Sequence, residues 1–329
     1  MASGERIGCA IITYNRPESF LRLYASIPRN KLDYFIVVND GKYFPEFNGL
    51  EVDEFIQHEA NEGVGRSKND ALRRMLELGI DHIFLIEDDI YLTDDSVFER
   101  YIEASKASGI QHFNYSQHGL LNKTPDKSPN PNALARYGRV EVAFYPYCVG
   151  AFSYYSLHCL QVVGLMDEIF FNAMEHVDHT LRIILEGLHP AYYYFADIGD
   201  SSLFFGEDEW SIEQSSISSQ GGHNENYKKA RALFIKKHDG VIRDLSPDFQ
   251  KLEISLERIM RSSGLLGTQE LFTSRVRLRS QDMLDNISSP LRLLRWLERR
   301  SPASSQVRLI EHCFESRGGG AVLVSLFLI

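Results

Sequence analysis

The chain has 329 residues, of which 43% are hydrophobic and 24% charged, a composition typical of a globular protein. Its net charge is −10, and residues 1–255 alone carry 24 basic and 38 acidic side chains, which argues against a nucleic-acid partner. No secretory signal is visible and no apolar run reaches the roughly 18 residues of a transmembrane helix, so we expect a cytoplasmic protein. The four cysteines are widely spaced and form no CxxC pair, which argues against a disulfide framework and a zinc site (Cys9, Cys148, Cys159 and Cys313).

Strand-like and helix-like segments alternate in the first part of the chain. We expect strands over residues 6–14, 34–38, 52–58 and 82–86. We expect helices over residues 19–27 and from the glycine-bearing loop at 61–66 to Leu78. Such alternation is typical of βαβ units, so we predict an α/β fold with a mostly parallel central sheet flanked by helices.

The segments after residue 95 follow a less regular order. We expect helices over residues 96–108, 177–185, 227–238 and 252–260, and strands over 140–147, 150–155 and 191–198. Residues 117–138 contain three prolines and are expected to form one long loop. Long loops of this kind inside a compact domain are often binding lids.

Three consecutive carboxylates, Glu87-Asp88-Asp89, end the apolar strand at 82–86. A buried charge needs a partner, and the carboxyl edge of an open α/β sheet is where such folds bind ligands. Carboxylate oxygens favour Mg²⁺ or Mn²⁺ over zinc. The alternative is a solvated acidic turn, because Asp94 and Asp95 follow closely.

Four segments are expected to meet at this edge, since each follows a strand: Thr13 to Pro17 (TYNRP), Asn39 to Gly41 (NDG), Asn61 to Asn69 (NEGVGRSKN) and Glu87 to Asp89 (EDD). Their order and spacing resemble the family 2 type of glycosyltransferase with the GT-A fold. The resemblance covers roughly residues 6–240. It implies a catalytic domain over 1–245, with a nucleotide-binding half at about 1–95 and an acceptor half at about 96–245.

The resemblance implies a nucleotide-sugar donor. Asp40 would accept from the ribose or base, although Asn-Asp-Gly also makes a tight turn without any ligand. Arg66 would reach the diphosphate, unless it is a solvated residue at a helix start. The donor-binding residues implied together are Thr13, Tyr14, Asn15, Arg16, Asp40, Gly63, Arg66, Asn69 and Asp88.

The resemblance also implies a Mn²⁺ or Mg²⁺ ion that neutralises the leaving nucleoside diphosphate. Glu87 and Asp89 occupy the outer positions of the D-x-D motif, where the family usually has aspartate first, so Glu87 is a departure. His223 would be a third metal ligand, or else an exposed loop histidine.

The acceptor-side base is sought in the segment Glu175-His176-Val177-Asp178. An inverting transfer needs a base within hydrogen-bond reach of the acceptor hydroxyl. Glu175 and Asp178 are both candidates and the sequence does not separate them, since Asp178 can instead pair with Arg182 at i+4. His176 could substitute as the base, because its ordinary pKa lies near neutrality.

We therefore predict a metal-dependent, inverting glycosyltransferase of the hexosyltransferase type that acts on a hydroxyl of a glycan or polysaccharide. The alternatives are a nucleotidyltransferase on a related scaffold and a non-catalytic sugar-binding relative. Residues 246–329 are expected to form a mainly helical, arginine-rich extension of unassigned role. Its basic segment at 290–300 suits peripheral contact with a membrane surface, or packing on the body of the protein. The oligomeric state is not predicted.

Overall fold

The computed structural model describes residues 4–207, 223–265 and 277–278. The chain divides into two compact units, Met1–Val276 and Arg277–Ile329. Of the second unit, only the short strand β12 (Arg277–Leu278) is described. The predicted segment 290–300 lies outside the described residues, and the predicted domain boundary at 245 stays a prediction.

The strands of the first unit are β1 (Ile7–Thr13), β2 (Tyr34–Asn39), β3 (Glu54–Gln57), β4 (His82–Glu87), β5 (Ile90–Leu92), β6 (His112–Asn114), β7 (Ala133–Tyr137), β8 (Val140–Tyr145), β9 (Phe152–Ser156), β10 (Phe195–Ile198) and β11 (Phe205–Glu207). Its α-helices are α1 (Pro17–Ser26), α2 (Val64–Glu77), α3 (Val97–Ser108), α4 (Leu157–Val163), α5 (Glu175–Leu185), α6 (His223–Lys237), α7 (Asp239–Ile242) and α8 (Phe249–Ser262).

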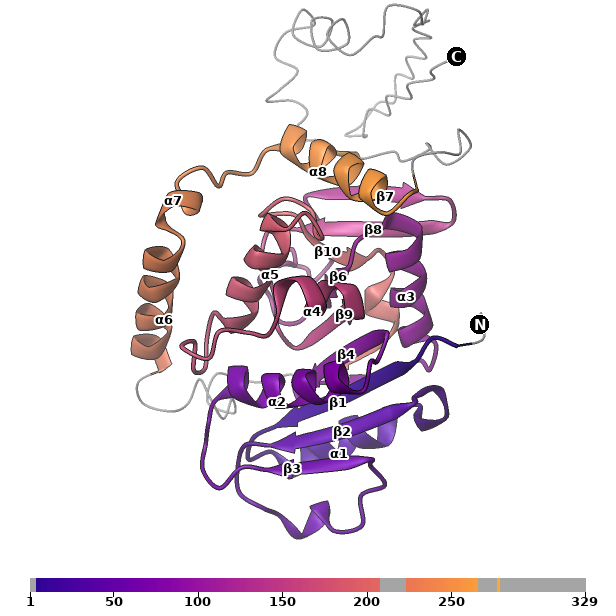
Figure 1. Cartoon of the computed structure of the whole chain (residues 1–329), viewed down its shortest axis with the longest axis vertical. Helices are drawn as coiled ribbons and strands as arrows, with labels where there is room; N and C mark the ends of the chain where they lie inside the picture. The colour runs from indigo at the N-terminus through magenta and orange to yellow at the C-terminus, as the bar shows by residue number, and fades with distance from the viewer. Residues whose placement is uncertain (1–3, 208–222, 266–276, 279–329) are drawn as a thin grey trace, which may run out of the picture. The chain divides into compact units, whose positions relative to one another are not determined.

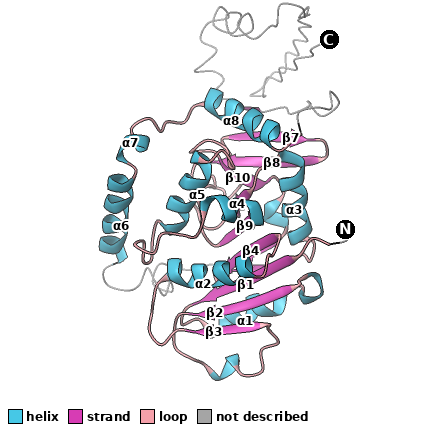
Figure 2. Cartoon of the chain, in the orientation of Figure 1, coloured by secondary structure: helices cyan, strands magenta, loops and turns pink. Residues whose placement is uncertain are grey.

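The central sheet has the strand order β3-β2-β1-β4-β9-β6 (Figure 1). The first four strands are parallel, whereas β9 runs antiparallel to both β4 and β6. The predicted α/β fold with a mostly parallel sheet flanked by helices is therefore confirmed (Figure 2). Because β1, β2 and β4 are parallel and adjacent, their carboxyl ends share one edge.

Smaller antiparallel ladders accompany this sheet, with β8 between β7 and β10, and β5 beside β11. The prediction of one loop over 117–138 was wrong at its end, because β7 begins at Ala133. Its sequence, ALARY, is short, and the pairing with β8 through a tight turn gives it strand geometry. The helix α4 and the short strands β5, β6 and β11 were not predicted.

Two hydrophobic clusters cover the two faces of the central sheet. On β1, Cys9 and Ile11 belong to one cluster, and Ala10 and Ile12 to the other, as the alternation of side chains along a strand requires. Helix α2 packs its predicted apolar face on the second cluster through residues that include Ala71, Leu72 and Met75. Both faces being covered explains why these strands are apolar throughout.

Helix α8 also belongs to the first unit. It buries Leu252, Leu256, Ile259 and Met260 in the first cluster, and it lies against α3. Asp248 caps it by accepting from the backbone N–H of Gln250 at 2.9 Å. None of the helices in the described part of the chain is long and apolar enough to cross a membrane.

Candidate functional site

The carboxyl ends of β1, β2 and β4 bring three predicted segments into direct contact. The Oγ1 of Thr13, at the end of β1, donates to Asp88 Oδ2 at 2.6 Å. The backbone N–H of Asp40, after β2, donates to the carbonyl of Thr13 at 3.0 Å. Both aspartates are buried. The expected meeting of these segments at one sheet edge is therefore observed.

Asp40 also organises the loop that leads into α2. Its Oδ1 accepts from the backbone N–H of Glu62 at 2.7 Å and its Oδ2 from that of Gly63 at 2.8 Å. His58 Nδ1 lies 2.7 Å from Oδ1. Gly63 has a φ of +92°, and a Cβ there would lie 2.4 Å from the carbonyl of Phe171. This loop therefore requires glycine at position 63.

The turn after β1 is held by Asn15, which has a φ of +56°. Its Oδ1 accepts from the backbone N–H of Lys42 at 2.8 Å. A Cβ on Gly41 would lie 2.5 Å from that oxygen, so the two turns approach as closely as a glycine permits. Tyr14 is partly buried next to it. A non-glycine residue at positive φ is a local strain of the kind found at functional sites.

Arg16 forms ion pairs with both Asp88 and Asp89. Burial raises the pKa of Asp88 to about 7, although the nearby guanidinium acts to lower it. Asp89 is 24% exposed in its side chain, so it is the carboxylate of the pair that solvent reaches. Arg16 thus supplies the positive charge that this acidic cluster demands.

Glu87 has a different partner. Its Oε1 lies 2.6 Å from the Nζ of Lys68, which is also 3.2 Å from Glu175 Oε1. Lys68 is 1% exposed and comes from the second turn of α2. Sequence reasoning missed Lys68; its only signal was a charged residue next to Asn69 on the otherwise apolar side of that helix.

The first turn of α5 carries the candidate bases. Met174 precedes it with a φ of +70°, and Glu175 is its first residue. His176 Nδ1 lies 3.0 Å from Glu175 Oε1, whereas Glu175 Oε2 has no hydrogen-bond partner among the described residues. Lys68 and His176 outweigh burial and hold the pKa of Glu175 well below its usual range.

Asp178 lies one turn further along α5 and is fully buried. Its Oδ1 lies 2.8 Å from Lys237 Nζ and 2.7 Å from His238 Nε2, and its Oδ2 accepts from Arg182 Nε at 3.1 Å. The ion pair with Arg182 that the sequence left open is therefore present, and two further cationic or polar groups join it.

Arg66 and Asn69 face residues 166–168. Arg66 pairs with Asp70 and Glu168 at 3.3 and 3.2 Å. Asn69 Nδ2 donates to the carbonyl of Met166 at 3.0 Å, and its Oδ1 accepts from the backbone N–H of Met166 at 2.8 Å. In this structure both side chains fasten α2 to that loop. The helix α6 begins at His223, whose side chain lies outside the described residues.

A second residue that sequence reasoning missed is His118, which comes from the loop before β7. Its Nε2 lies 3.8 Å from Asp89 Oδ2, and its Nδ1 lies 3.0 Å from Glu207 Oε2. Burial lowers its pKa, but Glu207 and Asp89 outweigh burial and raise the pKa of His118 above its ordinary value. The predicted loop therefore reaches the acidic cluster.

The side chains at this edge fit a hard divalent cation in their chemistry. Glu87, Asp88 and Asp89 offer carboxylate oxygens, the ligands that such cations prefer. In the described residues these oxygens face Arg16 and Lys68, and no three histidine, cysteine or acidic side chains are arranged to hold a metal. A bound cation would thus share the carboxylates with Arg16 or displace it.

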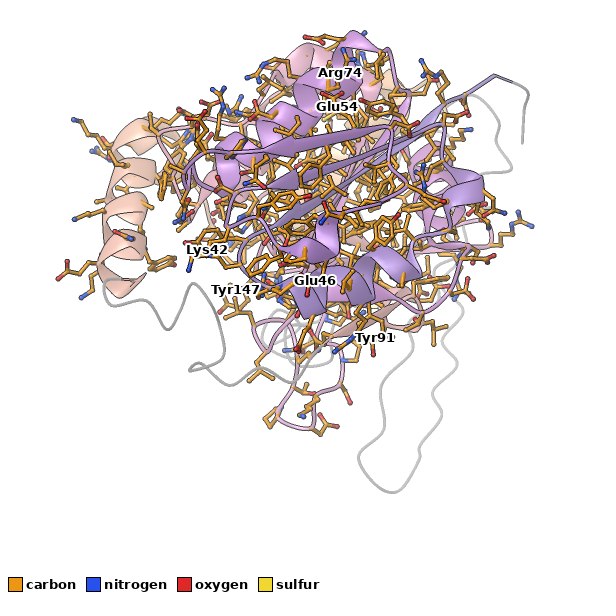
Figure 3. All side chains as sticks on the ribbon, turned by 90° about the horizontal axis from the view of Figure 1, so that it is seen from below. Lys42, Glu46, Glu54, Arg74, Tyr91 and Tyr147 are labelled. Atoms are coloured by element: carbon orange, nitrogen blue, oxygen red, sulfur yellow. The ribbon has the colours of Figure 1, made fainter. Side chains whose placement is uncertain are left out.

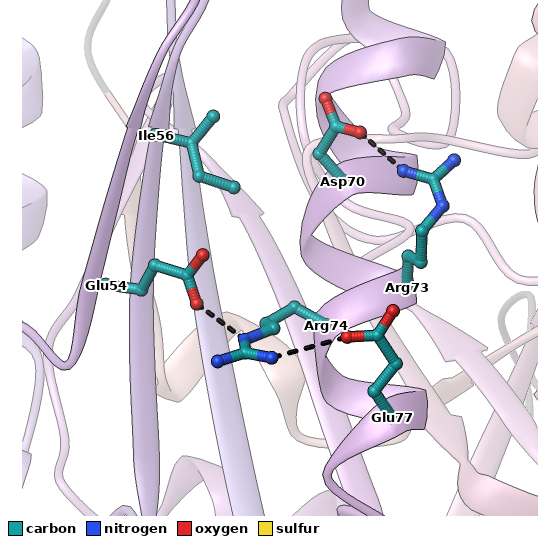
Figure 4. Close-up of a pocket in the computed structure, with 6 residues that line it drawn as sticks. All are labelled: Glu54, Ile56, Asp70, Arg73, Arg74 and Glu77. Carbon is teal, nitrogen blue, oxygen red and sulfur yellow. Dashed lines mark hydrogen bonds and ion pairs between the residues drawn. The ribbon is translucent and has the colours of Figure 1, made fainter.

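A surface depression of about 320 Å³ lies elsewhere, between β3 and α2 (Figure 4). Arg74 donates to Glu54 at 2.7 Å and Arg73 to Asp70 at 2.6 Å, so its charges pair with one another. Figure 3 shows Arg74 of α2 and Glu54 of β3 side by side. The depression contains none of the predicted site residues.

Comparison with known proteins identifies one curated relative, described as an uncharacterized glycosyltransferase, R363, of Acanthamoeba polyphaga mimivirus. It is 27% identical in an alignment of 258 positions that covers 72% of this chain and 94% of the relative. The chain is thus similar to this glycosyltransferase over most of its length. The resemblance seen in the sequence motifs is confirmed to that extent, while assignment to family 2 stays a prediction. No family model matches the chain.

Solved structures with a similar course of the chain include glycosyltransferases. TarS of S. aureus has a TM-score of 0.48 and 12% identity, over 89% of this chain and 47% of TarS. The mannosyltransferase PcManGT of Pyrobaculum calidifontis, in complex with GDP-Man and Mn²⁺, has a TM-score of 0.45 and 12% identity, over 82% of this chain and 78% of PcManGT. GalNAc-T7 with UDP, GalNAc and Mn²⁺ has a TM-score of 0.46 and 9% identity, over 80% of this chain and 55% of GalNAc-T7. The chain spans about half the length of TarS and GalNAc-T7. The α/β fold rests on the strand order given above.

Proposed function

We propose that this chain is a metal-dependent, inverting glycosyltransferase that moves a hexose from a nucleotide sugar to a hydroxyl of a glycan or polysaccharide. One observation carries the proposal: Asp88, after β4, accepts a hydrogen bond from Thr13 at the end of β1, and its neighbour Glu87 is joined through Lys68 to Glu175 on α5. A donor site and an acceptor-side carboxylate are thus neighbours, as a displacement reaction requires.

The donor would lie over the carboxyl ends of β1 and β2. Thr13, Tyr14 and Asn15 would line the nucleotide pocket, with Asp40 and Gly63 shaping its floor. Arg16 would turn its guanidinium to the diphosphate, since that group matches phosphate oxygens in a bidentate manner. Arg66, Asn69 and Asp88 complete the proposed donor set, with Arg66 and Asn69 acting through the loop that they fasten.

Asp89, with Glu87 or Asp88, would hold Mn²⁺ or Mg²⁺. When bound, the ion neutralises charge that develops on the departing nucleoside diphosphate. Among the described residues, His118 Nε2 lies 3.8 Å from Asp89 Oδ2. His223 remains the histidine ligand predicted from the sequence.

Glu175 is the proposed base. The acceptor hydroxyl would give its proton to Glu175 Oε2, its oxygen would form the new bond to the anomeric carbon, and the bond from that carbon to the diphosphate would break with its electron pair going to phosphate. Glu175 has an oxygen without a hydrogen-bond partner in the described structure, whereas both oxygens of Asp178 are engaged. His176 would orient Glu175 and stands as the alternative base.

The test is release of nucleoside diphosphate from a panel of UDP-glucose, UDP-N-acetylglucosamine, UDP-galactose and GDP-mannose, with Mn²⁺ and with EDTA. We expect Mn²⁺-dependent release from at least one donor, and its loss in Asp89→Ala with the melting temperature retained. Release of pyrophosphate from nucleoside triphosphates would instead identify a nucleotidyltransferase. Donor binding without any turnover would identify a sugar-binding protein.

A further inference from the structure

Lys68 is a fully buried ammonium group at the point where α2, α5 and the loop before β9 converge. Its Nζ lies 2.6 Å from Glu87 Oε1, 3.2 Å from Glu175 Oε1 and 3.4 Å from the carbonyl of Gly150. An ammonium has three donors, and here three acceptors surround it. Burying a lysine so completely is costly, and structures keep such a group when it is paired on all sides.

The elements around Lys68 approach one another closely. A Cβ on Gly65, one turn earlier on α2, would lie 3.1 Å from the carbonyl of Phe170 and 3.5 Å from Glu175 Cβ. A Cβ on Gly150 would lie 3.0 Å from the ring of His176. The backbone of α2 and the loop at Gly150 therefore press directly against the first turn of α5.

The two oxygens of Glu175 are consequently unequal. Oε1 is shared by Lys68 and by His176, which lies 3.0 Å away. Oε2 is buried without a hydrogen-bond partner among the described residues. Two contacts on one oxygen fix the rotation of the carboxylate about its last bond, and the second oxygen keeps its lone pairs for another donor.

We propose that Lys68 is a positioning residue of the transfer reaction: it fixes Glu175 so that Oε2 faces the acceptor hydroxyl, and it anchors this base to Glu87 of the donor side. This inference rests on the proposed function. Lys68 itself touches neither the sugar nor the acceptor, so its effect on the reaction passes through Glu175.

The experiment compares Lys68→Met, Lys68→Arg and Glu175→Gln with the double variant Lys68→Met/Glu175→Gln. Each is assayed for kcat and KM on the nucleotide sugar of the panel that the wild type turns over fastest. Loss of a base costs about 100-fold or more in rate, so we expect kcat to fall by about that factor in Lys68→Met and in Glu175→Gln. Lys68→Arg should restore kcat to within about tenfold of the wild type, since it keeps the charge.

The double variant gives the decisive comparison, because residues that act as one unit are not additive. We expect its kcat to lie within about threefold of that of Glu175→Gln. The double variant can also be assayed if Lys68→Met alone does not fold. Lys68→Met leaves both Glu87 and Glu175 without their ammonium partner, whereas the double variant leaves only Glu87. A kcat that falls by the full factor of Lys68→Met on top of Glu175→Gln would overturn the proposal.

Lys237→Met is the matched control. Lys237 also pairs with a buried carboxylate of α5, Asp178, at 2.8 Å. We expect a lower melting temperature with kcat retained. An equal loss of kcat in this control would mean that removing either lysine that pairs with a buried carboxylate of α5 acts through stability, which overturns the role given to Lys68. A wild type without turnover would instead refute the proposed function, and this inference with it.

Discussion

Two carboxylates one turn apart on α5 have opposite surroundings. Glu175 faces the carboxyl edge of the central sheet, shares one oxygen with Lys68 and His176, and keeps the other without a partner among the described residues. Asp178 contacts Lys237 at the end of α6 and Arg182 on α5 itself, and both of its oxygens are engaged.

The difference indicates different tasks on one helix. A carboxylate whose oxygens are all engaged holds structure together, because a proton or a ligand could reach it only by breaking existing contacts. A carboxylate with one oxygen available can accept a proton from a substrate. The pairing of Asp178 with Lys237 and His238 joins α5 to the end of α6, and Leu181 of α5 and Phe234 of α6 belong to the same hydrophobic cluster.

Removal of Asp178 should give the largest change in stability. Asp178→Ala leaves Arg182, Lys237 and His238 without their shared carboxylate in a buried position, which should lower the free energy of unfolding by about 3 kcal/mol or more. Urea unfolding at pH 7 measures this. Asp239→Ala, which breaks the exposed pair with Arg243, serves as the control and should leave the transition midpoint unchanged. Equal midpoints for the two variants would contradict the structural role of Asp178.

His179, next to Asp178 on α5, should make the stability of the protein depend on pH. It is fully buried and its Nε2 donates to the carbonyl of Gly164 at 2.9 Å; burial, helped by Arg182, lowers its pKa to about 3 from 6.5. Between those values the unfolded chain binds more protons than the folded one, so stability falls as pH drops. Between pH 7 and pH 5, His179 should account for a loss of about 2 kcal/mol in the free energy of unfolding.

The measurement is urea unfolding of the wild type and of His179→Gln at both pH values. The variant should lose about 2 kcal/mol less than the wild type on acidification. Parallel losses in the two proteins would show that His179 is not held neutral by its burial.

The smallest effect is expected at the surface depression beside α2. Arg73 is 41% exposed and pairs with Asp70 across one turn. Arg73→Ala should change the free energy of unfolding by less than about 1 kcal/mol, because exposed ion pairs contribute little. It should leave donor turnover unchanged. A loss of turnover would indicate that the functional site is this depression and not the carboxyl edge of the central sheet.

Much of the proposed donor side could be predicted from the sequence. Thr13 ends one apolar strand, and Asp40 and Asp88 follow two others. Parallel strands bring their carboxyl ends to one edge, so backbone topology alone places these residues together. The choice between Glu175 and Asp178 could not be predicted. It depends on which way the start of α5 turns and on contacts of Asp178 with Lys237 and His238, some 60 residues further along the chain.

Lys68 and His118 were missed for the same reason. Lys68 meets Glu175 across 107 positions in the sequence, and His118 comes from a loop whose prolines suggested only irregular structure. Periodicity describes which face of a helix is apolar, but it does not say which charged residue on that face finds two buried carboxylates. Such pairings are set by packing between distant segments.

The most direct test of this account is a comparison of donor turnover by Glu175→Gln and Asp178→Asn, with each rate expressed per folded molecule as measured by circular dichroism. We expect the first variant to lose about 100-fold or more in kcat and the second to stay within about threefold of the wild type. The reverse order, with Asp178→Asn inactive and Glu175→Gln active, would contradict the assignment of the base and the division of tasks along α5.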